Sequence, residues 1–136
     1  MTTTTQATGT MRIGSWEEET YGELEGAPKL SHDRITHSFA GDIEGDGTAQ
    51  FLNAYQGEAT ALYSGYERVA GRLGGRAGSF VLSISGVYAD GVARTTWSVV
   101  PGTATGELQG LRGEGGFDAG GAAGDGYTYR LDYHFE

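Results

Sequence analysis

Glu67 and His37 are the two residues whose chemistry and position suggest a catalytic site. Each lies on the apolar side of an alternating segment, Glu67 two residues before Val69 and His37 between Ile35 and Phe39. A carboxylate facing an aromatic interior loses hydration, which disfavours its charged form and suits it to general acid or base catalysis. His37 could exchange protons with a substrate or pair with Glu67. We predict both as catalytic residues; the alternatives are a structural role for either or an outward-facing Glu67.

Large aromatic side chains share the same inward-facing positions. A tyrosine brings an apolar ring and a hydroxyl that needs a partner. Such residues could orient an enol, ketone or epoxide oxygen, or fill the interior and hydrogen bond to one another. The predicted substrate-binding residues are Phe39, Tyr55, Tyr63, Trp97, Tyr129 and Tyr133.

The elements that must position these side chains are β-strands, because apolar residues recur at every second position nearly throughout the chain. Turn signals, among them Gly45-Asp46-Gly47, Gly74-Gly75, Asp90-Gly91 and Gly120-Gly121, separate the segments. Strands are predicted near residues 7–16, 29–44, 48–55, 60–73, 76–88, 92–100, 113–119 and 126–136. Pro101 to Arg112 is predicted as a loop or a short turn of helix.

These elements predict an all-β fold: a single antiparallel barrel of eight strands over residues 7–136, after a disordered tail at residues 1–6, with a sandwich as the alternative. The chain has 136 residues, 25 of them glycine. Glycines inside strands, such as Gly65, Gly71 and Gly86, could allow the bends that close a small barrel. A bulge between residues 60 and 73 would reverse the side to which Glu67 points.

The net charge and the composition disfavour several classes of binding partner and cofactor. A net charge of -9 disfavours binding to nucleic acid or to a membrane surface. We expect a cytoplasmic protein, because the first residues lack the basic and apolar regions of a signal peptide. No cofactor and no metal are expected, since the chain has no cysteine and its three histidines are scattered.

Leu62 and Tyr66 are predicted to face outward, which suggests a homo-oligomer, a dimer or trimer. The acidic run Glu17-Glu18-Glu19 is predicted as solvated loop.

Four segments carry a resemblance to a known family: residues 65–71, 78–82, 97–102 and, most specifically, Gly106-Glu107-Leu108-Gln109-Gly110-Leu111-Arg112-Gly113-Glu114-Gly115. The chain resembles the bacterial domain of unknown function 3224 from about Ala7 to Glu136. The resemblance implies an allene-oxide-cyclase-like barrel, related in architecture to dirigent proteins. Members often carry Gln and His where this chain has Ser83 and Ile84, so chemistry that depends on that histidine is in doubt here.

The predicted function is a barrel that holds a small hydrophobic intermediate in its lumen and promotes its isomerisation or cyclisation. Cavity shape would hold a reactive conformer, and Glu67 or His37 would donate or accept a proton. Two alternatives remain at this point: a non-catalytic carrier of a hydrophobic metabolite, and a barrel with a filled core and no ligand.

Overall fold

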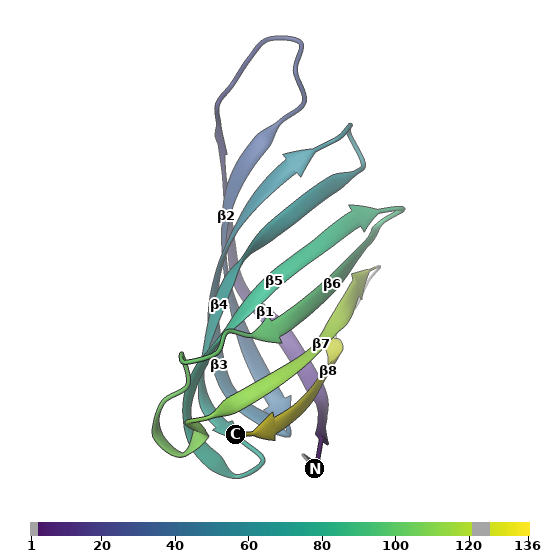
Figure 1. Cartoon of the computed structure of the whole chain (residues 1–136). Coiled ribbons are helices and arrows are strands. Elements are labelled where there is room, and N and C mark those ends of the chain that lie inside the picture. Colours follow the sequence, from purple (N-terminus) through teal and green to yellow (C-terminus); the bar gives the residue numbers. More distant parts are fainter. Residues whose placement is uncertain (1–2, 121–125) are drawn as a thin grey trace.

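The computed structural model describes residues 3–120 and 126–136, and over these residues eight antiparallel strands close into one barrel (Figure 1). Each strand pairs with the next along the chain, and the last pairs with the first. The strands are β1 (Thr5–Tyr21), β2 (Leu30–Gly41), β3 (Ile43–Tyr55), β4 (Ala61–Leu73), β5 (Arg76–Ala89), β6 (Val92–Val99), β7 (Leu111–Gly120) and β8 (Tyr127–Phe135). The predicted all-β barrel is confirmed.

The turns follow the glycine signals with one exception. Gly74-Gly75 and Asp90-Gly91 form tight turns in which all four residues have positive φ. The predicted turn at Gly45-Asp46-Gly47 is wrong, because these residues lie inside β3 and the chain reverses at Gly41 and Asp42 instead. Gly121 of the last predicted turn lies outside the described residues.

The acidic run was also predicted wrongly as loop. Glu17, Glu18 and Glu19 belong to β1, which continues to Tyr21 and pairs with β2 over that length. β1 begins at Thr5, two residues before the predicted start of the barrel domain at Ala7.

The two ends of the barrel differ. At one end, here called the terminal end, lie both chain termini and the short 3₁₀ helix η1 (Gly106–Leu108), while the β1–β2 turn projects from the other, the hairpin end (Figure 1). Leu108 of η1 is buried and closes the terminal end. The lumen there is packed with apolar side chains, including Met11, Ile43, Leu73, Phe80, Leu82, Leu111 and Leu131. Among the described residues, no helix is long and apolar enough to span a membrane.

Four inward-facing side chains cross a neighbouring strand at a glycine and bond to the strand beyond it. Tyr63 of β4 pairs with Gly86 of β5, and its hydroxyl lies 2.6 Å from Thr95 Oγ1 of β6. Trp97 of β6 pairs with Gly115 of β7 and donates its indole hydrogen to the Arg130 carbonyl of β8 at 3.0 Å.

Two further side chains, Tyr129 and Glu67, cross a neighbouring strand in the same way. Tyr129 of β8 pairs with Gly9 of β1 and donates its hydroxyl to the Ala40 carbonyl of β2 at 3.0 Å. Glu67 of β4 passes over Gly47 of β3 to reach His37 of β2. The four contacts, here called the cross-strand ties, therefore connect β2, β4, β6 and β8 to one another around the whole barrel.

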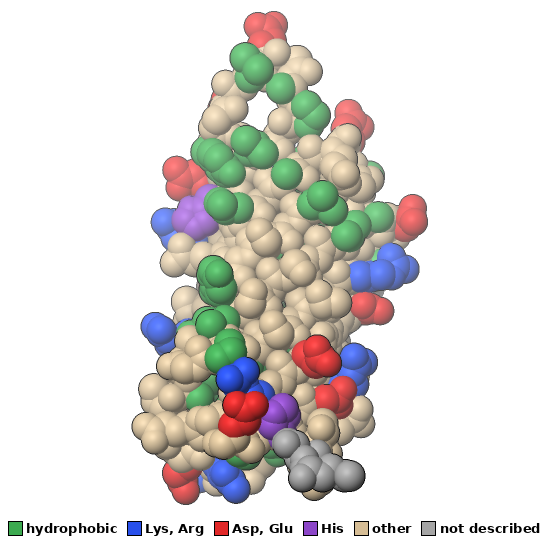
Figure 2. Space-filling view, in the orientation of Figure 1, with side chains coloured by type: hydrophobic (Ala, Val, Ile, Leu, Met, Phe, Trp, Pro, Cys, Tyr) green, Lys and Arg blue, Asp and Glu red, His purple; other side chains and the backbone are tan. Residues whose placement is uncertain are grey.

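The outer face carries several exposed apolar side chains. β4 pairs with both neighbours without a register shift, so Leu62 and Tyr66 face outward as predicted, 46% and 62% exposed. Figure 2 shows apolar side chains interspersed with charged ones of both signs on the face that it presents. Homo-oligomer formation stays a prediction.

Gly65→Ala is expected to lower the free energy of unfolding by about 2 kcal/mol. A Cβ at this position would collide with the Gln50 carbonyl, which the β3–β4 pairing holds in place. Urea unfolding of the purified protein measures the change. Gly57→Ala is the matched control, because nothing lies within 4 Å of a Cβ there, and it should change stability by less than about 0.5 kcal/mol. Equal effects of the two substitutions would contradict the role of Gly65 in close strand approach.

Candidate functional site

The centre of the candidate site is a buried hydrogen bond between His37 and Glu67. His37 Nδ1 lies 2.7 Å from Glu67 Oε2, and the two side chains are 4% and 0% exposed. Both residues therefore face inward, as their alternating segments predicted, and the structure brings them together from β2 and β4.

Gly47 makes this contact possible. It pairs with His37 on one side and with Val69 on the other, so it lies between the two strands that carry the pair. A Cβ at Gly47 would collide with the Glu67 carboxylate and come within 2.9 Å of the Phe39 ring. Gly47 was predicted to lie in a turn. In the structure it lies inside β3, and its lack of a side chain leaves room for Glu67 to reach His37.

Two atoms of the pair remain available for chemistry. Glu67 Oε1 is the only buried side-chain nitrogen or oxygen in the described part of the chain that lacks a hydrogen-bond partner. His37 Nε2 accepts or donates no hydrogen bond to any described residue, since its ring bonds through Nδ1 alone. Buried polar groups in proteins are nearly always partnered, so an Oε1 with no protein partner is unusual.

Aromatic rings surround the pair. The His37 ring lies 6.1 Å from Phe39 and 6.5 Å from Phe117, both edge-on. The centroid of the Phe39 ring lies 5.7 Å from that of Tyr129 and 6.4 Å from that of Trp97. Of the predicted substrate-binding residues, Phe39, Trp97 and Tyr129 thus gather beside the pair. Phe117 joins them; its inward position was evident from the sequence, but it was not among the predicted binding residues.

The remaining predicted binding residues lie elsewhere. Tyr63 packs against Phe51 at 5.9 Å on the hairpin side of the lumen. Tyr55 lies near the hairpin end, where its hydroxyl donates to Glu18, and Tyr133 lies at the terminal end beside Phe135. Burial raises the pKa of the Tyr63 and Tyr129 phenols, so these groups stay neutral and serve as hydrogen-bond donors and acceptors rather than bases.

The barrel wall opens beside His37. β1 pairs with β8 only from Thr5 to Met11, and in the described pairings residues 12–21 of β1 contact β2 alone. A bulge at Gly14 shifts the register between Ile13 and Ser15, and bulges bend a strand and redirect its side chains. Ile13 is the direct strand partner of His37 and is 38% exposed. The inner side of β1 is therefore partly exposed at Ile13, whereas His37 and Glu67 themselves stay buried.

A polar network occupies the inner side of the projecting β1–β2 hairpin. The buried Asp33 accepts hydrogen bonds from Trp16 Nε1 at 2.8 Å and from Ser31 Oγ at 2.9 Å. Glu18 accepts from Lys29 at 3.0 Å and from Tyr55 at 2.9 Å. The sequence analysis missed this network, because the bulge at Gly14 changes which β1 residues face inward. Within the described residues, no three His, Asp or Glu side chains come together as a metal site would require.

Removing either partner of the His37–Glu67 hydrogen bond should lower the free energy of unfolding. His37→Phe leaves the buried Glu67 carboxylate without its partner and is expected to destabilise the barrel by about 3 kcal/mol. Combining it with Glu67→Leu should recover part of this loss, giving a coupling of about 1–3 kcal/mol in a double-mutant cycle measured by urea unfolding. Strictly additive effects would show that the two side chains do not interact.

Glu18 should stabilise the hairpin only above acidic pH. The hydrogen bond from Lys29 lowers the pKa of the Glu18 carboxyl from its ordinary value of 4.5, assisted by Tyr55 and Ser31 and opposed by burial. A lowered folded-state pKa gives stability above the unfolded-state pKa that is lost as the pH falls. Wild type should therefore exceed Glu18→Gln by about 0.5 kcal/mol or less near neutral pH, and the gap should close under acid. A gap that widens in acid would contradict this assignment.

Comparison with known proteins places the chain in one family. Residues 7–133 match the family described as "Protein of unknown function (DUF3224)". The barrel is similar to the crystal structure of a protein with unknown function from the DUF3224 family of Shewanella oneidensis MR-1, with a TM-score of 0.82 and 29% sequence identity over 98% of this chain and 99% of that one. No curated protein matches the chain. The chain with the buried His37–Glu67 pair belongs to the DUF3224 family.

Proposed function

We propose that this barrel is a cofactor-independent isomerase or cyclase that binds a small hydrophobic molecule and moves a proton through His37 and Glu67. The observation that carries the proposal is the buried pair itself, with one free carboxylate oxygen, enclosed by aromatic rings. Acids and bases in such water-poor surroundings are effective in proton transfer.

In the proposed mechanism each member of the pair has its own role. Glu67 Oε2 accepts the hydrogen from His37 Nδ1, which leaves the lone pair of Nε2 directed away from the bond. Nε2 then removes a proton from a carbon next to a carbonyl or enol group and returns it at another position. Glu67 holds the imidazole in this tautomer and stabilises the imidazolium that forms. Glu67 Oε1 remains free to accept a hydrogen bond from a substrate hydroxyl.

Comparison with the other cross-strand ties supports a chemical role. The three remaining ties use uncharged groups: a tyrosine with a threonine, an indole with a carbonyl, and a tyrosine with a carbonyl. A tie between alternate strands thus needs no carboxylate or imidazole. A buried carboxylate costs desolvation free energy that a neutral residue avoids, so the Glu67–His37 tie carries a cost that structure alone does not explain.

The packing of the lumen limits the size of the substrate and the side from which it can enter. Apolar side chains fill the terminal end of the lumen, and aromatic rings meet across its middle. A substrate would therefore enter from the hairpin end, beside Ile13, and contact His37 before Glu67. Phe117 and Tyr63 are half-buried there and would have to move aside. These features favour a small, largely apolar molecule.

The proposal is tested with 5-nitrobenzisoxazole, a small aromatic probe of buried bases. A base removes its ring C–H proton, the N–O bond breaks, and a coloured nitrile phenolate forms. We expect a saturable rate above that of buffer, and we expect Glu67→Gln and His37→Phe each to lower it by about 100-fold. Absorbance of the phenolate measures the rate.

Two control variants separate chemistry from folding. Thr95→Val removes the Tyr63 tie and leaves the pair in place, and Glu18→Gln alters a carboxylate outside the lumen centre; both should keep most of the rate. The proposal fails if no variant of the pair changes the rate while circular dichroism shows an intact barrel. Binding of the neutral dye N-phenyl-1-naphthylamine that survives both pair substitutions, without turnover, would favour the carrier instead.

A further inference from the structure

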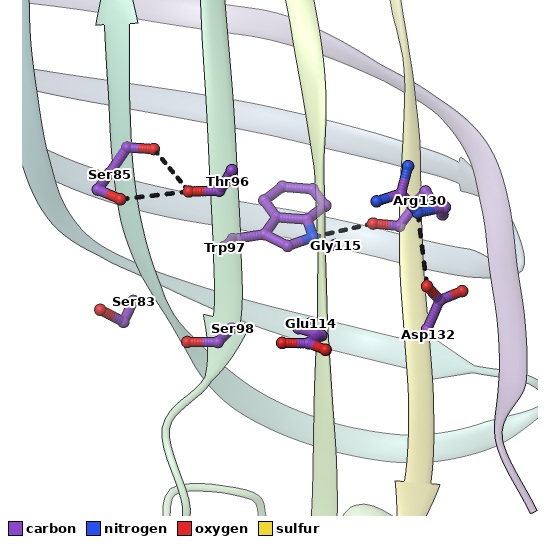
Figure 3. Close-up of a pocket in the computed structure, with 9 residues that line it drawn as sticks. All are labelled: Ser83, Ser85, Thr96, Trp97, Ser98, Glu114, Gly115, Arg130 and Asp132. Carbon is purple, nitrogen blue, oxygen red and sulfur yellow. Dashed lines mark hydrogen bonds and ion pairs between the residues drawn. The ribbon is translucent and has the colours of Figure 1, made fainter.

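The outer face of β5 to β8 holds a polar hollow of about 440 Å³ (Figure 3). Its size falls within the range of small-molecule sites. It lies on the opposite side of the barrel wall from the lumen, and its polar lining consists of Ser83, Ser85, Thr96, Ser98, Glu114, Arg130 and Asp132.

Two glycines of β7 lie at the hollow: Gly115 lines it, and Gly116 occupies the outward position beside it. In one row across the sheet, Thr96 pairs with Gly116 and Gly116 pairs with Arg130, so the middle of the row has no side chain. A Cβ at Gly116 would collide with the Thr95 carbonyl, so the position must stay empty. The side chains of β6 and β8 form the two walls.

The next row is a line of polar groups on four consecutive strands. Ser83 pairs with Ser98, Ser98 with Glu114, and Glu114 with Asp132. Neighbouring strands lie about 4.8 Å apart, so hydroxyl and carboxylate groups repeat at the spacing of one strand. In the described residues, Ser83, Ser98 and Glu114 make no side-chain hydrogen bond, whereas Arg130 lies 3.5 Å from Asp132.

The lining selects one class of ligand. One guanidinium beside two carboxylates leaves the hollow net negative, which disfavours phosphates and other anions. Apolar ligands gain little from a hydroxyl-rich wall. Hydroxyls together with planar carboxylate and guanidinium groups offer both donors and acceptors to neighbouring hydroxyls of a ligand. We propose that this hollow binds a neutral saccharide.

Tyr66 extends the site at its β4 side. It pairs directly with Ser83 and is 62% exposed on the outer face. An exposed tyrosine ring offers an apolar surface for the C–H face of a sugar and a hydroxyl for a hydrogen bond. An oligosaccharide lying across β4 to β8 would therefore contact the ring with one unit and the polar hollow with the next.

The test is a titration of the ¹⁵N-labelled full chain with cellotriose and maltotriose, followed by amide NMR shifts. We expect saturable shifts confined to Tyr66 and to residues 83–85, 96–98, 114–116 and 130–132. Glu114→Ala and Arg130→Ala should each weaken binding about tenfold, since each removes a charged hydrogen-bonding group. Arg68→Ala, an exposed arginine on the outer face of β4, is the matched control and should bind as wild type does.

Three results would overturn the proposal. These are the absence of saturable shifts with either sugar, shifts confined to the lumen residues, and shifts induced at the hollow by inorganic phosphate but not by sugar. The substitutions lie outside the lumen, so the rate with 5-nitrobenzisoxazole should not change in them. Loss of that rate would show that they disturb the barrel; Ser98→Phe, which fills the hollow from an outward position, then decides, and it must abolish the sugar-induced shifts.

Discussion

Space inside the closed barrel is the constraint on which the rest of the structure depends. Large side chains at every inward position could not fit in one lumen. Here β2, β4, β6 and β8 supply large groups that reach across the lumen wall, and the strands between them supply a glycine at each crossing: Gly9, Gly47, Gly86 and Gly115. The cross-strand ties follow from this division, which accounts for four of the 25 glycines of the chain.

The His37–Glu67 pair combines a structural and a chemical role in one tie. It connects β2 to β4 as the other ties connect their strands, yet it alone places an ionisable carboxylate in the aromatic lumen. β1 departs from β8 beyond Met11, and Ile13, the strand partner of His37, is partly exposed there. A tie with a purely mechanical role would gain nothing from either feature. The proposed proton transfer depends on both features, the buried carboxylate and the partly exposed strand beside it.

The alternation of apolar and polar residues was sufficient to predict the barrel, most strand positions and the inward direction of Glu67 and His37. It could not place Gly45 and Gly47, because glycine permits both a positive-φ turn and close strand approach, and only pairing across strands distinguishes them. It also could not locate the bulge at Gly14, which depends on the register between β1 and β2. The network of Trp16, Asp33 and Glu18 was missed for that reason. The distance between His37 and Glu67 depends on pairing between residues 30 positions apart, which a local pattern does not contain.

Gly115 and Gly116 show how one pair of residues shapes both faces of the wall. Gly115 lets Trp97 cross β7 to the Arg130 carbonyl on the lumen side and also lines the polar hollow, whereas Gly116 leaves an outward position between Thr96 and Arg130 without a side chain. The two proposed sites therefore share a wall one residue thick, and the Arg130 backbone contributes to one while its side chain lines the other. Substitutions at either glycine would disturb both sites together. Glu67, which points inward from β4, and Glu114, which points outward from β7, are the positions at which the two functions can be separated.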